Sequence, residues 1–185
     1  KYFFVLVIVF FFLVNQNYIL YGGIFYDDWS LATGNWNLSF YERLKVHGLL
    51  FFNTRPIGAL YASIITTLGK NDLLYILINS SIWLGSGIIL FITFRKFISE
   101  NFAVVFILIF LFPSFASTPF FSPVTQSLTG ISVFFWSLSI YFSYRKQFKF
   151  VTFFYILSVL SYEISVVLFL FNILLLIDLN SFEKD

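Results

Sequence analysis

Long apolar segments that recur along the chain constrain its fold more than any other feature. A helix needs about 20 residues to cross the roughly 30 Å hydrocarbon core of a bilayer. Six apolar segments occur, and all but the fifth approach that length: 2–20, 73–94, 102–121, 126–144, 150–161 and 164–179. The sequence therefore predicts an all-α fold, a polytopic transmembrane helix bundle of about six spans.

The composition agrees with a chain surrounded by lipid. Hydrophobic residues make up 59% of the sequence and charged residues only 11%, whereas a soluble domain carries about 25% charged residues. The net charge of +2 comes from scattered basic residues and does not favour nucleic acid as a partner. Cysteine is absent, which excludes disulfides and thiolate metal sites.

The ends of the sequence suggest a piece of a longer protein. Position 1 is Lys1 rather than methionine, and the chain stops soon after an apolar segment. We expect residues 1–185 to be one domain, the N-terminal transmembrane portion of a longer chain. Segment 3–14 resembles a signal peptide, but no small-residue cleavage site follows it and the first alanine is Ala32, so we expect a retained first helix.

Basic residues predict the orientation. Clusters at 95–96 and 145–149 flank apolar segments, and the positive-inside rule places them in the cytoplasm. If segment 56–68 does not cross, the chain alternates cleanly, and residues 27–28, Arg55 and Glu163 all lie outside. Residues 40–70 are then expected to form juxtamembrane helices in the first outer loop. One of them would begin at Arg55-Pro56, because proline suits the first turn of a helix.

The run Tyr26-Asp27-Asp28-Trp29 is the first candidate site. Two adjacent carboxylates repel each other, which raises the pKa of one of them. Such a group can act as a general base toward a hydroxyl or amine, or bind a divalent cation through oxygen. The aromatic neighbours can stack on a sugar. The alternative is a solvated loop with ordinary interfacial aromatic residues.

Arg55 and Glu163 are charged residues within apolar surroundings. The Arg55 guanidinium offers a fork of donors that suits phosphate, although an arginine can also extend to lipid headgroups. Glu163 separates the fifth and sixth segments, unless 150–179 is one long kinked helix. It is a candidate partner for Arg55 or for a substrate amine, or an ordinary residue at the end of a helix.

Three further residues have simpler interpretations. His47 is the only histidine, so no zinc site can form around it, and we expect it at the membrane interface. Gly85 and Gly87 are expected to be contacts between packed helices.

Four short motifs, in this order, resemble the GT-C class of membrane glycosyltransferases, which use polyprenyl-phosphate-linked sugars and include protein O-mannosyltransferases and the aminoarabinose transferase of lipid A. The acidic pair at 27–28 follows the first apolar segment, and Thr-Arg-Pro-Ile-Gly-Ala-Leu-Tyr at 54–61 follows in the same loop. Gly-Lys-Asn at 69–71 precedes the next segment, and Leu-Ser-Tyr-Glu at 160–163 opens the last one. Arg55 and Tyr162 stand where lysine is frequent in the family.

The resemblance implies roles for these residues. Asp27 would deprotonate the acceptor with Asp28 assisting, and Arg55 would hold the lipid phosphate. Glu163, Tyr26 and Trp29 would contact the substrate. The donor needs no nucleotide, and a divalent cation (Mg or Mn) is required by some members only. The implied partners are the polyprenyl-phosphate sugar donor, an extracytoplasmic acceptor and the lipid bilayer.

The expected function is therefore sugar transfer from a polyprenyl-phosphate carrier to a cell-surface glycan, lipid or protein. The expected location is the bacterial plasma membrane, with the active site on its extracytoplasmic side. Three alternatives remain open: a lipid-linked sugar or small-molecule transporter or flippase, a polysaccharide polymerase, and a membrane scaffold. A transporter should show polar residues at mid-helix, and a scaffold should tolerate replacement of Asp27, Asp28, Arg55 and Glu163.

Overall fold

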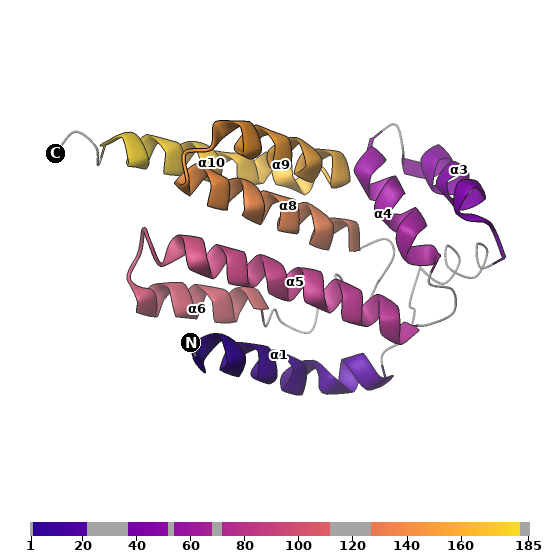
Figure 1. The fold of residues 1–185 in the computed structure, drawn as a ribbon, viewed down its shortest axis with the longest axis horizontal. Helices are drawn as coiled ribbons and strands as arrows, with labels where there is room; N and C mark the ends of the chain where they lie inside the picture. Colours follow the sequence, from indigo (N-terminus) through magenta and orange to yellow (C-terminus); the bar gives the residue numbers. More distant parts are fainter. Residues whose placement is uncertain (1, 22–36, 52–53, 68–71, 112–126, 182–185) are drawn as a thin grey trace.

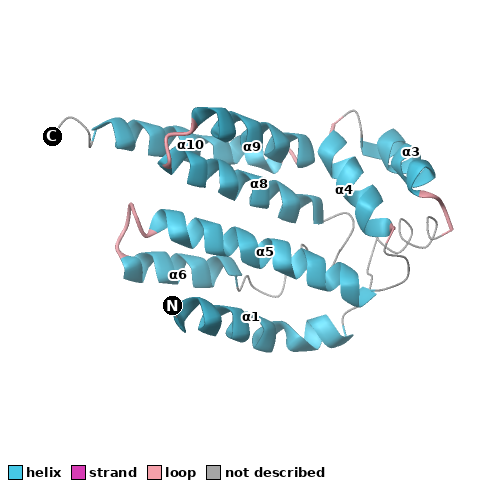
Figure 2. Ribbon diagram, in the orientation of Figure 1, coloured by secondary structure: helices cyan, strands magenta, loops and turns pink. Residues whose placement is uncertain are grey.

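The computed structural model describes residues 2–21, 37–51, 54–67, 72–111 and 127–181. Within these ranges the chain forms eight helices and no strand (Figures 1 and 2). The helices are α1 (Tyr2–Tyr21), α3 (Phe40–Phe51), α4 (Pro56–Thr66), α5 (Asp72–Phe94), α6 (Glu100–Leu111), α8 (Ser127–Tyr144), α9 (Phe148–Ser161) and α10 (Ile164–Ser181). The all-helical prediction is confirmed for this part of the chain.

Six of the helices run alongside one another, and α3 and α4 lie together at one end of them (Figure 1). Helices α5 and α8 form the centre: α5 contacts α1, α6 and α8, while α8 also packs against α9 and α10. Each predicted apolar segment overlaps one helix of the bundle, although segment 102–121 is described only as far as Leu111. The bundle therefore follows the hydrophobic pattern of the sequence.

The fifth and sixth segments form separate helices. Tyr162 ends α9 in an extended conformation, with φ −162° and ψ 136°, and α10 then returns alongside α9 (Figure 1). The alternative of one kinked helix over 150–179 is therefore wrong. The reversal brings the start of α10 beside the end of α9 and creates a turn at residues 161–164.

Glycines allow α5 to approach its neighbours closely. A Cβ atom added at Gly87 would lie 2.6 Å from Cδ2 of Leu111 on α6, and one added at Gly85 would lie 3.4 Å from Cε2 of Phe134 on α8. Both glycines are thus contacts between packed helices, as predicted. The same region holds a core of large apolar side chains that includes Phe11, Leu90, Phe91, Ile107 and Ile140.

Helices α3 and α4 begin with local signals that the sequence carries. Ser39 and Glu42 form a capping box: the Ser39 amide and hydroxyl donate to Glu42 Oε2 at 2.8 and 2.7 Å, and the Glu42 amide donates to Ser39 Oγ at 3.4 Å. Pro56 opens α4, where its missing N–H costs no hydrogen bond. With 12 and 11 residues, these helices are about 17–18 Å long and shorter than a bilayer core.

The surface of the bundle is apolar, and many serine hydroxyls are buried in its interior. Phe102 and Ile109 on α6 are 71% and 70% exposed, and Val167 on α10 is 68% exposed. Serines are fully buried at positions 80, 86, 132, 137, 139, 143, 158, 161 and 165. Large exposed apolar patches mark surfaces that contact other apolar matter, and buried hydroxyls between helices are typical of helices packed in lipid.

Among the described residues, one helix is both long enough and apolar enough to cross a membrane, at Leu73–Phe94. Four further apolar helices have between 10 and 17 residues: Pro56–Thr66, Glu100–Leu111, Leu128–Tyr144 and Phe148–Ser161. The structure thus contains one candidate membrane span by length and composition.

Candidate functional site

Two of the predicted site residues, Arg55 and Glu163, come together at the turn between α9 and α10. Arg55 Nε donates to Glu163 Oε2 at 2.6 Å, and Arg55 Nη2 donates to Glu163 Oε1. Both arms of the guanidinium fork are thus used on one carboxylate, the geometry that makes arginine–carboxylate pairs specific. The other predicted residues, Tyr26, Asp27, Asp28 and Trp29, lie outside the described residues.

Tyr162 completes the cluster. Its ring lies under the Arg55 guanidinium, with the carbon Cζ 4.2 Å from the ring centroid, within the range of a cation–π contact. Tyr162 supports the guanidinium from one face while Glu163 holds its edge.

The Arg55–Glu163 pair is accessible to water. The side chain of Glu163 is 61% exposed and that of Arg55 is 23% exposed. The hydrogen bonds to Arg55 lower the pKa of Glu163 below its usual range, and the same bonds raise the pKa of Arg55. Both groups are therefore charged at neutral pH, at a position that a soluble anion can reach.

Hydrogen bonds with α8 fix the turn that carries Tyr162 and Glu163. Ser132 Oγ lies within hydrogen-bonding distance of the Ser158 carbonyl at 3.0 Å and of the Tyr162 carbonyl at 3.3 Å. The Ser165 hydroxyl also donates to the Tyr162 carbonyl, at 2.7 Å, and the Ser158 hydroxyl donates to the Ser132 carbonyl at 2.6 Å. These bonds join α8, α9 and α10 at the turn that carries Glu163.

Helix α4 is positioned against this turn by a glycine. A Cβ atom at Gly58 would lie 2.7 Å from the backbone carbonyl oxygen of Ser161 and 3.2 Å from Cδ2 of Leu128. No real Cβ atom fits so close to a backbone oxygen, so the first turn of α4 touches the end of α9 because position 58 is glycine. This contact places Arg55, just before α4, beside Glu163.

The other side of α4 packs on α5. The Tyr61 hydroxyl donates to Asn79 Oδ1 at 2.7 Å, and Ile65 packs against the fully buried ring of Tyr75. Burial raises the pKa of Tyr61, so its hydroxyl stays protonated and able to donate. Helix α4 is therefore held between α5 and the α9–α10 turn, which makes the position of Arg55 well defined.

His47 is fully buried between α3 and α4. Its Nε2 atom lies 3.5 Å from Thr66 Oγ1, and its Nδ1 atom is buried without a hydrogen-bond partner. Burial and the nearby Arg43 charge lower the pKa of His47, so the ring is neutral. Within the described residues no group of three or more histidine, cysteine or carboxylate side chains is arranged to hold a metal ion.

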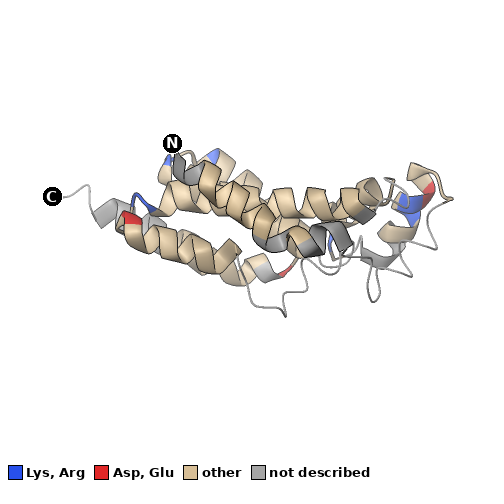
Figure 3. Cartoon of the chain, turned by 90° about the horizontal axis from the view of Figure 1, so that it is seen from below, with Lys and Arg blue, Asp and Glu red and all other residues tan. Residues whose placement is uncertain are grey.

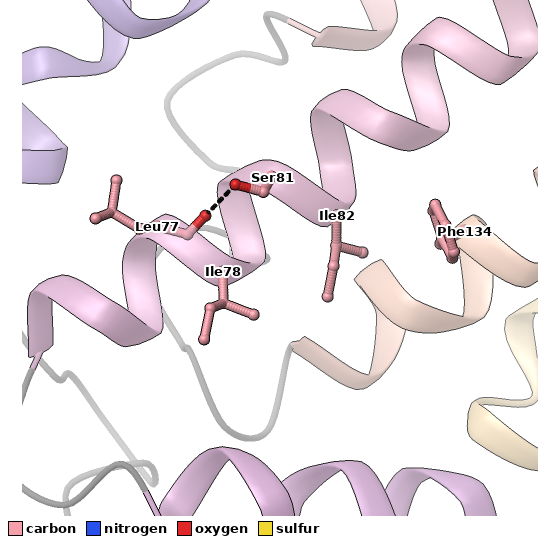
Figure 4. Close-up of a pocket in the computed structure, with 5 residues that line it drawn as sticks. All are labelled: Leu77, Ile78, Ser81, Ile82 and Phe134. Carbon is pink, nitrogen blue, oxygen red and sulfur yellow. Dashed lines mark hydrogen bonds between the residues drawn. The ribbon is translucent and has the colours of Figure 1, made fainter.

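A groove lies between α5 and α8. Its volume is about 340 Å³, and its lining is formed by Leu77, Ile78, Ser81, Ile82 and Phe134 (Figure 4). The Ser81 hydroxyl donates to the Leu77 carbonyl of its own helix at 2.7 Å and is not aimed into the groove as a free donor. The groove therefore offers apolar contact and no chemistry.

No family model matches the chain, and neither a curated protein nor a solved structure shows significant similarity to it.

Proposed function

We propose that this chain belongs to a membrane-embedded glycosyltransferase that moves a sugar from a polyprenyl-phosphate carrier to an extracytoplasmic glycan, lipid or protein. The observation that carries this proposal is the placement of Arg55: a guanidinium fork, supported by Tyr162 and by the docking of α4, at an accessible point near one end of an apolar bundle. Phosphate is a preferred ligand of such a fork.

The surface of the bundle supports its location in a membrane. Exposed apolar side chains cover α1, α6, α9 and α10, and such patches on a water-facing surface would promote association. We propose a bundle of about six spans, in which the shorter helices cross with the help of adjoining residues. Its location would be the bacterial plasma membrane.

The distribution of charge supports an orientation. Charged residues are sparse along the helices and gather toward the ends of the bundle (Figure 3). The turns after α5 and α8 expose Arg95, Lys96, Arg145 and Lys146, and the positive-inside rule assigns such an end to the cytoplasm. The Arg55–Glu163 pair lies at the other end of α9, where the proposal puts the active site.

The proposed reaction is a single displacement. The acceptor hydroxyl oxygen forms a bond to the anomeric carbon, and the bond from that carbon to the phosphate oxygen breaks, which inverts the configuration. The acceptor proton passes to Asp27, with Asp28 assisting, and the electron pair remains on the phosphate. Arg55 stabilises that developing charge, while Tyr26 and Trp29 would stack on the sugar.

A transporter or flippase is the second candidate, because polar side chains are buried at mid-helix. Asn172 of α10 donates from Nδ2 to Ser139 Oγ at 2.8 Å, and its Oδ1 atom is buried without a partner. The Ser139 hydroxyl donates to the Val151 carbonyl at 3.2 Å. These groups mostly bond to one another and to the backbone, which favours helix packing over a passage for substrate.

The small number of arginines in this region argues against a polysaccharide polymerase. Such an enzyme would need several arginines in outer loops to hold its substrates, and Arg43 and Arg55 are the two in this region of the sequence. Arg43 is only 5% exposed, and its Nε donates to the Leu38 carbonyl at 2.8 Å. Its position thus anchors the start of α3 and leaves Arg55 as the accessible guanidinium.

The test is sugar transfer in membranes that contain the full-length protein and labelled polyprenyl-phosphate sugars. Asp27→Asn or Asp28→Asn should lower transfer by about 10²–10⁴-fold, and Arg55→Ala by about 10²-fold. Arg95→Ala, an exposed arginine at the other end of α5, serves as the matched control and should transfer at the wild-type rate. Equal transfer by all variants, or label that crosses the bilayer without reaching an acceptor, would contradict the proposal.

A further inference from the structure

The guanidinium fork proposed to hold phosphate is already occupied by a carboxylate. Glu163 uses both Nε and Nη2 of Arg55, and a phosphate that binds this edge of the guanidinium in the bidentate manner would need the same two donors. Phosphate and Glu163 therefore cannot occupy the Nε–Nη2 edge together. Any anion that binds Arg55 in this way must first displace Glu163.

Arg55 is held in place, whereas Glu163 is free to leave. The Arg55 guanidinium rests on the Tyr162 ring at 4.2 Å, and its backbone is fixed because it immediately precedes α4. The Glu163 side chain is 61% exposed, so it can rotate into water without burying its charge. Exposed ion pairs contribute little to stability, and the cost of opening this one is correspondingly small.

We propose that Glu163 is a built-in competitor for phosphate at Arg55. This inference rests on the proposed function, because it takes the phosphate of the polyprenyl carrier as the competing anion. The pair is closed when no carrier is bound, opens when the phosphate takes the fork, and closes again as Glu163 displaces the polyprenyl phosphate that remains after transfer. The site thereby rejects weakly bound anions and releases its product.

A purely structural ion pair makes the opposite prediction for one variant. If the pair only fixes α4 to the α9–α10 turn, then Glu163→Gln and Arg55→Ala both loosen the site and both weaken phosphate binding. If Glu163 competes, Glu163→Gln frees the fork and strengthens binding, while Arg55→Ala weakens it. The sign of the Glu163→Gln effect therefore separates the two roles.

The experiment measures binding of geranylgeranyl phosphate, a soluble analogue of the product, to the full chain in detergent micelles. Geranylgeraniol, which lacks the phosphate, reports binding of the prenyl tail alone. Glu163→Gln should bind the phosphate about two- to fivefold more tightly than wild type, from the strength of an exposed ion pair. The double variant with Arg55→Ala should bind as weakly as Arg55→Ala alone, and geranylgeraniol should bind all variants equally.

Glu100→Gln is the matched control. Glu100 is an exposed glutamate in the first turn of α6, so this change removes the same charge far from Arg55 and should leave phosphate binding at the wild-type level. A gain in affinity that persists in the double variant would instead reflect long-range charge and would overturn the inference.

The binding results distinguish a failure of the competition between Glu163 and phosphate from a failure of the proposed function. If Arg55→Ala weakens phosphate binding but Glu163→Gln weakens it or leaves it unchanged, competition is wrong and the phosphate site stands. If no variant shows phosphate binding that depends on Arg55, both are wrong. A thermal unfolding measurement on each variant shows whether a loss of binding follows from a loss of structure.

Discussion

The two ends of the bundle present their arginines in different ways. At one end, Arg95 and Arg145 are exposed in the turns that follow α5 and α8. At the other, Arg55 is placed by a glycine contact, paired through both arms of its fork and stacked on Tyr162. In the first arrangement Arg95 lies over the Phe91 ring of its own helix at the longer distance of 5.8 Å, and charge is its main feature. The second uses geometry, which is a feature of sites that recognise a particular group.

The contact that places Arg55 is tested most strongly by a substitution at Gly58. Gly58→Ala should destabilise the protein by about 1–3 kcal/mol, because the new Cβ would meet the Ser161 carbonyl at 2.7 Å and force the backbones apart. Gly130→Ala on α8 is the control. A Cβ atom there meets nothing within 4 Å, so the better helix propensity of alanine should stabilise by up to about 1 kcal/mol. Chemical denaturation in micelles measures both.

The second-largest expected effect is the loss of stability on replacing Ser132, a buried serine that contacts the α9–α10 turn. Ser132→Ala removes a hydroxyl that lies between the Ser158 and Tyr162 carbonyls and should cost about 1 kcal/mol of unfolding free energy. Ser81→Ala, whose hydroxyl is exposed and bonds within its own helix, should change stability by less than about 0.5 kcal/mol. Equal effects of the two changes would show that the turn is not fixed from α8.

At the other end of the bundle, a glycine substitution at Lys146 should increase stability. Lys146 has a φ of 55° and occupies the left-handed position of a Schellman motif after α8, in which the Lys146 and Gln147 amides donate to the Ser143 and Phe142 carbonyls. Lys146→Gly should therefore stabilise by about 1 kcal/mol.

Arg145→Gly is the neighbouring control and should lose stability, because its φ is not positive and glycine adds only entropy to the unfolded chain. A glycine would fit position 146 better than lysine does. The lysine at this strained position places a positive charge at the end of the bundle that we propose to face the cytoplasm.

Much of the architecture follows from the sequence, because hydrophobic segments and helix signals are local. Segment 73–94 corresponds to α5 (Asp72–Phe94), and Pro56 begins α4 as its position in the sequence indicated. The pairing of Arg55 with Glu163 was one of several open possibilities, since topology placed both residues on one side of the bundle. The stacking of Tyr162 and the contact of Gly58 depend on the geometry of a turn between distant segments, which no local pattern specifies.

Two features of the site region were missed for identifiable reasons. The buried serines carried a signal, because positions 132, 139 and 143 are spaced by seven and four residues and share one face of α8. His47 was expected at an interface, yet α3 and α4 pack as a pair and enclose it. The sequence showed each helix as amphipathic or apolar but did not show which polar faces would meet.

The smallest expected effect is the response of the Arg55–Glu163 pair to acid. The pKa of Glu163 is lowered by its hydrogen bonds to Arg55, so the pair's contribution to stability is complete at neutral pH and is lost as the pH falls through the folded-state pKa, below about pH 4. Other carboxylates titrate in the same range, so the useful quantity is the difference in unfolding free energy between wild type and Glu163→Gln.

That difference should be constant between about pH 8 and pH 5 and should shrink below about pH 4 as Glu163 in the wild type becomes neutral. Because Glu163 is largely exposed, the difference should be small throughout. A difference that stays unchanged between about pH 8 and about pH 3 would mean that the Arg55–Glu163 pair adds nothing to stability through its charge.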